Sequence, residues 1–124
     1  MAGDSSERKR VFDLEERTYL FGKGVRLTLR KLKIDPINDS DVKQVIRSSG
    51  SVGANYIEAN ESLSKKDFFY RVKICRKESK ETAFWLRMIL ETGGNGIKDD
   101  LVALHKEAVE LKKIFSSIIE KGNK

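Results

Sequence analysis

The stretch RSSGSVGANYIEANES, residues 47–62, decides the fold, because it can be interpreted either as a ligand-binding loop or as a helix. Its glycines, serines and asparagines are frequent in turns and in loops that hold phosphates. However, a spacing of three and four residues continues through it, as in one face of an amphipathic helix. The positions on that face are Val42, Val45, Ser49, Val52, Tyr56 and Ala59. The spacing therefore predicts a helix over about 40–60, and not a phosphate loop.

The same spacing recurs in three further segments, which predicts helices over about 13–34, 65–91 and 97–120. In the segment 13–34 the predicted core positions are Leu14, Thr18, Phe21, Val25, Thr28 and Leu32. In 65–91 they are Phe68, Val72, Cys75, Ser79, Thr82, Leu86 and Ile89, and in 97–120 they are Ile97, Leu101, Leu104, Ala108, Leu111, Phe115 and Ile118. With the helix at 40–60, the chain contains four amphipathic helices.

The helix boundaries carry recognisable signals. Pro36 disfavours helical geometry at the preceding residue, and Asp39 or Ser40 can cap the helix that follows. Ser64 and Asp67 resemble a capping box, and the sequence TGGNG at 92–96 ends the third helix. Short connections between four such helices predict an all-α, antiparallel up-down-up-down four-helix bundle. We expect one domain over 1–124, in which 1–12 form a flexible or loosely helical extension.

Composition excludes several classes of protein. The chain has 124 residues, of which 39% are hydrophobic and 35% charged, as in a soluble, charge-rich helical protein. It lacks a run of about 18 apolar residues, and the start MAGDSSERKR lacks the apolar region of a secretory signal, so we expect a cytoplasmic protein without membrane contact. One cysteine, Cys75, and one histidine, His105, allow neither an internal disulfide nor a Cys/His zinc site. We expect no metal and no cofactor.

Positive charge is concentrated in two of the four helices. The formal net charge is +6, and residues 13–34 carry +3 and 65–91 carry +4, whereas 39–62 carry −2 and 98–120 carry −1. Opposite the core positions of the third helix lie Lys66, Lys73, Arg76, Lys77, Lys80 and Arg87, with Arg26 and Arg30 of the first helix as further candidates. Such a set is most often a solvated face. Alternatively it binds the RNA or DNA backbone, because clustered Lys and Arg side chains displace counterions from phosphates.

A second apolar stripe on the third helix consists of Tyr70, Ile74, Trp85 and Met88. A bundle needs one core-facing stripe, so a second one indicates either a wide core or a subunit interface. We favour the interface and expect a homo-oligomer, in which several copies of the basic face could act together.

The helix over 40–60 also has a polar stripe, formed by Ser48, Ser51, Asn55 and Glu58. The small residues Gly50, Gly53 and Ala54 beside it would let a neighbouring backbone approach closely. We interpret the stripe as a packing and hydrogen-bonding motif that fixes helix register, with a group such as Arg71 as a partner. Glu58 and Glu78 could be proposed as paired carboxylates, but no nucleophile with a nearby base accompanies them, so we assign no catalytic residue.

The run RSSGSVGANYIEANESLSKKDFFYRVKICRKESKETAFWLRMILE, residues 47–91, resembles the 23S rRNA intervening-sequence family, also called S23 ribosomal proteins. The resemblance rests on the polar stripe, followed by an aromatic and basic helix with Glu78 or Glu81 near its middle. It implies a bacterial four-helix bundle that forms a homopentamer and associates with nucleic acid. The family is also similar to the accessory variability protein of diversity-generating retroelements, a basic pentamer that binds nucleic acid and a reverse transcriptase.

This sequence departs from the family pattern at two places. Ala59 replaces a common glycine, and the third helix carries the more basic run CRKESKE at 75–81. The basic helix faces, the second apolar stripe and the family resemblance together predict a non-enzymatic, homo-oligomeric bundle that binds RNA or DNA through basic helix faces. The alternative is a protein-interaction scaffold that docks an acidic partner or a nucleic-acid enzyme such as a reverse transcriptase.

Overall fold

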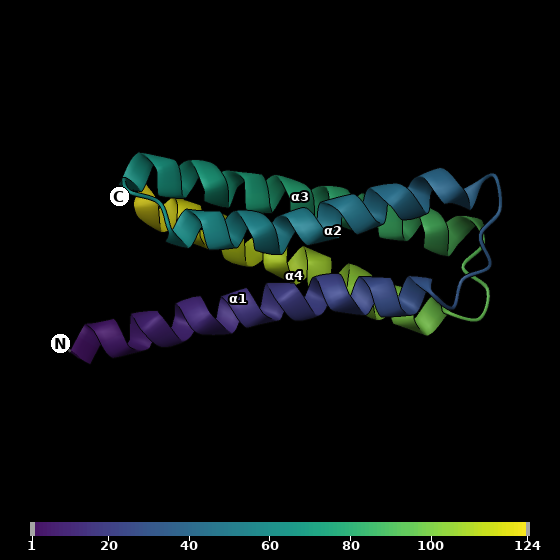
Figure 1. Cartoon of the computed structure of the whole chain (residues 1–124), viewed down its shortest axis with the longest axis horizontal. Coiled ribbons are helices and arrows are strands. Elements are labelled where there is room, and N and C mark those ends of the chain that lie inside the picture. Colours follow the sequence, from purple (N-terminus) through teal and green to yellow (C-terminus); the bar gives the residue numbers. More distant parts are fainter. Residues whose placement is uncertain (1, 124) are drawn as a thin grey trace.

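The computed structural model describes residues 2–123, with side chains from residue 13 onward. Its elements are four helices, α1 (Ala2–Leu29), α2 (Asn38–Asn60), α3 (Lys65–Thr92) and α4 (Lys98–Gly122), and no strand occurs in the described part of the chain. Each helix runs opposite to the one before it (Figure 1). Helix α2 packs against α1 and α3, and α4 packs against α3 and α1. The predicted antiparallel up-down-up-down four-helix bundle is therefore confirmed.

The predicted core positions form the observed core. Most of them are buried, and the largest side chains that are almost completely enclosed include Val25, Val45, Val52, Leu86, Leu111 and Phe115. The rings of Tyr56 and Phe115 join α2 to α4, with centroids 5.9 Å apart. At the end of α4 the fully buried residue is Ile119, whereas the predicted Ile118 is partly buried and packs against the core. A helix with 3.6 residues per turn drifts from a strict seven-residue repeat, so the buried position moves on by one residue.

Helix α1 does not have the predicted bounds of 13–34. It begins at Ala2 and ends at Leu29. Beyond that point the N–H groups of Lys31 and Leu32 bond to carbonyl oxygens only three residues back, which tightens and ends the helix before Pro36 is reached. Pro36 was expected to end the first helix, but the chain before it is no longer helical, so Pro36 does not determine where α1 ends.

The caps of α2 and α3 differ in their agreement with the sequence. Neither Asp39 nor Ser40 caps α2, and the carboxylate of Asp35 instead accepts hydrogen bonds from the backbone N–H groups of Ile37 and Asn38, both at 2.8 Å. An aspartate immediately before proline can form this turn because its side chain reaches the N–H two residues ahead. Ser64 does cap α3, and its hydroxyl oxygen accepts from the Asp67 N–H at 3.1 Å.

Small residues bring α2 close to α1, as predicted. A Cβ atom at Gly53 would lie 3.4 Å from the Cβ of Thr18 and 3.6 Å from the Thr18 backbone carbon. A Cβ atom at Gly22 would lie 3.5 Å from the backbone oxygen of Ser49. The glycines that weaken these helices as isolated segments therefore let the two backbones approach.

The turn between α3 and α4 yields a stability prediction. Gly94 and Gly96 both have positive φ, +48° and +84°, but only Gly94 is enclosed, since a Cβ there would lie 2.9 Å from Leu101 Cδ1. We expect Gly96→Ala to lower the free energy of unfolding by about 1 kcal/mol, the cost of left-handed backbone alone. Gly94→Ala should lower it by roughly 2–3 kcal/mol, because steric overlap is added.

Urea unfolding of the two variants measures this difference. Equal losses for Gly94→Ala and Gly96→Ala would show that Leu101 moves away at no cost, contrary to the prediction.

Candidate functional site

The outward face of α3 carries a continuous stripe of basic and aromatic side chains. We call it the α3 stripe; it consists of Lys66, Tyr70, Lys73, Lys77, Lys80, Phe84 and Arg87. Successive members are spaced alternately by four and three residues, so they lie on one side of the helix. All seven are exposed, whereas the core positions of the same helix are buried.

Several cations of the α3 stripe are not neutralised by nearby carboxylates. Within residues 13–123, no acidic side chain pairs with Lys66, Lys73 or Lys80, and Lys77 has only a long contact of 3.9 Å to Glu78. Arg87 differs, because its Nε lies 2.5 Å from Glu91 in an exposed ion pair. The stripe can therefore attract a polyanion, most strongly along 66–80.

The remaining predicted cations have different surroundings. Arg76 is half-buried beside the α3 stripe. On α1, the guanidinium of Arg26 donates hydrogen bonds to the backbone oxygens of Gly22, at 2.9 Å, and of Ile46 on α2, at 3.1 Å. Arg26 thus joins two helices through its cationic group, and Arg30 lies exposed one turn further on.

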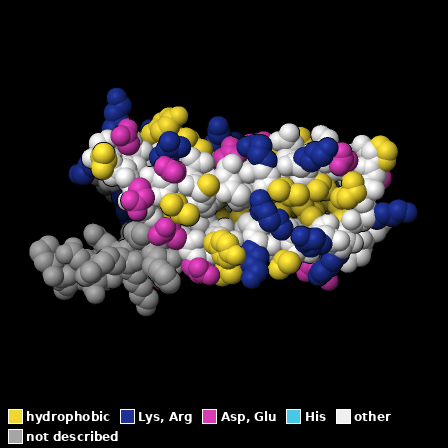
Figure 2. All heavy atoms as spheres, viewed as in Figure 1, with side chains coloured by type: hydrophobic (Ala, Val, Ile, Leu, Met, Phe, Trp, Pro, Cys, Tyr) yellow, Lys and Arg dark blue, Asp and Glu magenta, His cyan; other side chains and the backbone are white. Residues whose placement is uncertain are grey.

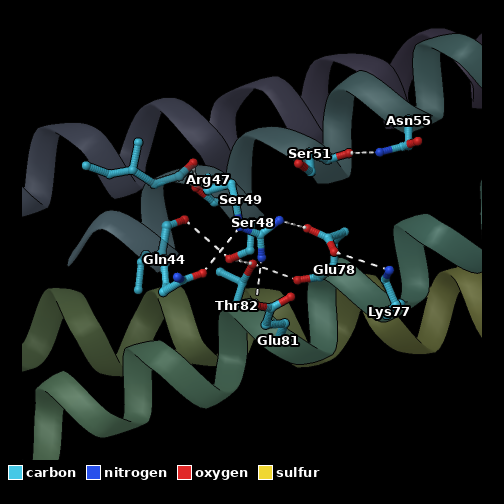
Figure 3. A network of polar contacts seen from close by, with 12 residues as sticks. Gln44, Arg47, Ser48, Ser49, Ser51, Asn55, Lys77, Glu78, Glu81 and Thr82 are labelled. Atoms are coloured by element: carbon cyan, nitrogen blue, oxygen red, sulfur yellow. Dashed lines mark hydrogen bonds and ion pairs between the residues drawn. The ribbon is translucent and has the colours of Figure 1, made fainter. Parts of the chain in front are cut away.

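Glu78 and Glu81 in the middle of α3 point toward α2, where they form a polar network (Figure 3). Glu78 is 4% exposed, and its carboxylate lies 2.9 Å from Arg47 Nη1. Arg47 Nη2 donates to Glu81 at 2.6 Å, and the indole N–H of Trp85 donates to the same carboxylate oxygen at 3.3 Å. Arg47 is the link that sequence reasoning missed, because nothing in its spacing distinguishes it from a solvated arginine.

This network changes the acidity of its members. The hydrogen bond from Arg47 is the main cause that lowers the pKa of Glu81, and the bond to Glu81 is the main cause that raises the pKa of Arg47. Both groups therefore stay charged at neutral pH. Cys75 is affected differently, since burial raises the pKa of its thiol to about 12, so it is not a ready nucleophile.

The predicted polar stripe of α2 divides between the core and the surface. Ser48 is fully buried, and its hydroxyl oxygen lies 2.7 Å from Thr82 Oγ1 on α3. Asn55 is half-buried and accepts a hydrogen bond from Arg71 at 3.1 Å, the partner that the sequence suggested. Ser51 is half-buried, with a backbone oxygen that accepts from the Asn55 amide at 2.9 Å. Glu58 is exposed and makes no side-chain contact of this kind within 13–123.

The residues of α3 that were predicted to form a subunit interface differ in their exposure. Tyr70 is 61% exposed and belongs to the α3 stripe. Ile74, Trp85 and Met88 are half-buried, and Trp85 packs against the core. A wide core therefore accounts for part of this set.

An apolar groove lies between α1 and α2. It has a volume of about 480 Å³, and its lining includes Gly22, Gly50 and Gly53. Three large side chains line it that are about half exposed or more, namely Tyr19, Leu27 and Ile57. Figure 2 shows hydrophobic side chains gathered with Lys and Arg over this face of the molecule. We call this feature the α1/α2 groove.

Within the described residues, no group of three His, Cys, Asp or Glu side chains is arranged to hold a metal ion. None of the helices, over the same part of the chain, has the length and apolarity needed to cross a membrane. The features that stand out are thus a basic and aromatic stripe, an ion pair to a buried carboxylate and an apolar groove.

The ion pair between Arg47 and the buried Glu78 leads to a second prediction. Arg47→Ala should lower the free energy of unfolding by about 1–3 kcal/mol, because the buried carboxylate of Glu78 loses its hydrogen bond and keeps only the long contact with Lys77. Adding Glu78→Gln should recover part of the loss, which a double-mutant cycle in urea measures. The control is Lys43→Ala, which removes an exposed pair with Asp39 and should cost about 0.5 kcal/mol or less. Losses of equal size for Arg47→Ala and Lys43→Ala would contradict the argument.

Comparisons with known proteins agree with the resemblance noted in the sequence. The chain is similar over 85% of its length to a solved structure of unknown function from the S23 ribosomal protein family of Bacteroides thetaiotaomicron VPI-5482. The two are 28% identical, with a TM-score of 0.72, and the match covers 96% of that chain. No curated protein matches the sequence. The family model described as 23S rRNA-intervening sequence protein matches residues 27–117, and the chain belongs to this family.

Proposed function

We propose that this protein is a non-enzymatic, homo-oligomeric bundle that binds the backbone of RNA or DNA through the α3 stripe. The observation that carries the proposal is the row of exposed lysines at 66, 73 and 80, which have no acidic partner among residues 13–123. Lysines in such a row gain free energy by displacing counterions from phosphates, and this gain is independent of base sequence.

The orientation of the acidic side chains strengthens this electrostatic argument. Glu78 and Glu81 belong to the same helix as the lysines, but their carboxylates are held by Arg47 on the side toward α2. The two acidic residues in the middle of α3 are therefore withdrawn from the α3 stripe. A phosphate chain that approaches this face meets cations first, and repulsion is confined to the ends of the helix at Asp67 and Glu91.

Self-association would multiply a weak electrostatic affinity, because one nucleic acid could contact several copies of the α3 stripe. We propose the α1/α2 groove as the contact surface between copies. Tyr19, Leu27 and Ile57 leave about half or more of their surface in solvent, which is costly unless another molecule covers it. A surface of this kind on α1 and α2 leaves the α3 stripe available.

The third prediction tests the basic stripe. Replacing Lys66, Lys73 and Lys80 together by glutamine should weaken duplex binding at least about tenfold at low salt, because three phosphate contacts are lost. The slope of log affinity against log salt concentration should become shallower by roughly 2–3. Anisotropy titrations over a range of salt concentrations measure both quantities.

The matched control makes the same change of charge on α4, with Lys98, Lys106 and Lys121 replaced by glutamine. These lysines are exposed and lack an acidic partner within 13–123. An equal effect in both triple variants would mean that net charge, and not the α3 stripe, determines binding.

The fourth prediction tests the groove. Leu27→Glu places a charge in the α1/α2 groove and should reduce the mass measured by light scattering to that of a monomer. Leu63→Glu is the control, because Leu63 is 99% exposed in the α2–α3 connection and should leave the mass unchanged. A wild-type monomer, or an oligomer that tolerates Leu27→Glu, would count against assembly through the groove.

A second candidate function is a scaffold that docks an acidic protein, such as a nucleic-acid enzyme, on the same face. The exposed rings of Tyr70 and Phe84 favour it, since protein interfaces commonly bury aromatic side chains. Nuclease treatment separates the two functions. A complex that survives nuclease supports the scaffold, and one that is lost supports nucleic-acid binding.

A further inference from the structure

Two aromatic rings lie within the row of lysines on α3. Tyr70 stands between Lys66 and Lys73, and Phe84 stands between Lys80 and Arg87. Tyr70 is 61% exposed and Phe84 is 51% exposed. Their spacing places both rings on the same face as the lysines, so this face offers aromatic surface for stacking in addition to positive charge.

We propose that the α3 stripe selects single-stranded nucleic acid, whose bases stack on Tyr70 and Phe84 while the lysines between them contact phosphates. This inference rests on the proposed function and names the class of nucleic acid. Aromatic side chains interleaved with cations suit a single strand, because its bases are free to leave their own stack. In a duplex the bases are already stacked and paired, so the rings would be of little use.

The spacing of the rings suits such a strand. Tyr70 and Phe84 are separated by about 21 Å along the helix at 1.5 Å per residue. A stacked strand advances about 3.4 Å per nucleotide, so roughly six nucleotides would extend from one ring to the other. Lys73, Lys77 and Lys80 lie between the rings on the same face, where the phosphates of those nucleotides would pass.

Each ring is also held in place by its neighbours. Arg71, whose guanidinium donates to Asn55, lies with Cζ 5.9 Å from the centroid of the Tyr70 ring. Phe84 packs edge-on against Trp85, with centroids 4.8 Å apart. A ring that is already restrained loses less conformational entropy when a base stacks on it.

A surface hollow lies beside Phe84. It has a volume of about 460 Å³ and is lined by Phe84, Arg87, Met88, Glu91 and Thr92. A base that stacks on Phe84 can extend over Met88 in this hollow. Arg87 already forms an ion pair with Glu91. A phosphate that binds Arg87 has to displace the carboxylate of Glu91, which weakens binding at this end. We therefore expect the Tyr70 end to contribute more to binding than the Phe84 end.

The fifth prediction is tested by anisotropy with a labelled, mixed-sequence single strand of about 12 nucleotides and with the duplex of the same sequence. Tyr70→Ala and Phe84→Ala should each weaken single-strand binding, Tyr70→Ala by about fivefold or more. Neither should change duplex binding by more than about twofold. Lys73→Gln should weaken binding of both, because it removes a phosphate contact.

Conservative variants separate stacking from apolar contact. Tyr70→Phe and Phe84→Tyr retain the ring and should retain single-strand affinity, whereas Tyr70→Leu and Phe84→Leu should lose it. Both positions are exposed, so the variants are expected to fold, and their thermal unfolding checks this. Poly-glutamate of equal total charge serves as a competitor that carries negative charge but no bases.

The possible outcomes distinguish this inference from the proposed function. Failure of the wild-type protein to bind either probe removes both. Binding of both probes with no effect of Tyr70→Ala and Phe84→Ala removes the inference and leaves backbone binding standing. Leucine variants that bind the single strand as well as the wild type would overturn the inference, because apolar contact would then suffice without stacking. Displacement by poly-glutamate as efficient as by the strand would overturn it in favour of an acidic protein as the occupant.

Discussion

The ion pair between Arg47 of α2 and the buried carboxylate of Glu78 on α3 is the constraint on which the rest of the structure depends. Apolar residues in a helix seam tolerate several registers, because one aliphatic side chain replaces another at little cost. A buried carboxylate tolerates only the register that brings its partner within reach. The contact of Ser48 with Thr82 in the same seam adds a second requirement of this kind. Together they determine how α3 is rotated against α2.

That rotation determines what α3 presents to solvent. With Glu78 and Glu81 turned toward Arg47, the opposite side of the helix contains lysines and two aromatic rings. The helix thus separates its charges, acidic toward α2 and basic outward. The face that we propose for polyanion binding arises from this separation and not from the modest net charge of the whole chain, which is +6.

The two surfaces proposed for binding lie on different parts of the bundle. Helices α1 and α3 each pack against α2 and α4 but not against one another, so they occupy diagonal positions. A second copy that covers the α1/α2 groove therefore leaves the α3 stripe open. Assembly and nucleic-acid binding can then reinforce each other, because each added copy brings another stripe to the same strand.

The sequence by itself determined the helices, the bundle and nearly all of the core, because the spacing of apolar residues is a local property of a helix. It also placed the exposed lysines on one face of α3 and suggested the contact of Arg71 with Asn55. It could not assign Arg47 or distinguish Arg26 from a free surface cation, since their partners, Glu78 and the Ile46 carbonyl, are distant in sequence. Only the tertiary structure decided which carboxylates face inward and which aromatic side chains stay in solvent. These properties depend on how neighbouring helices are rotated, and no single helix contains that information.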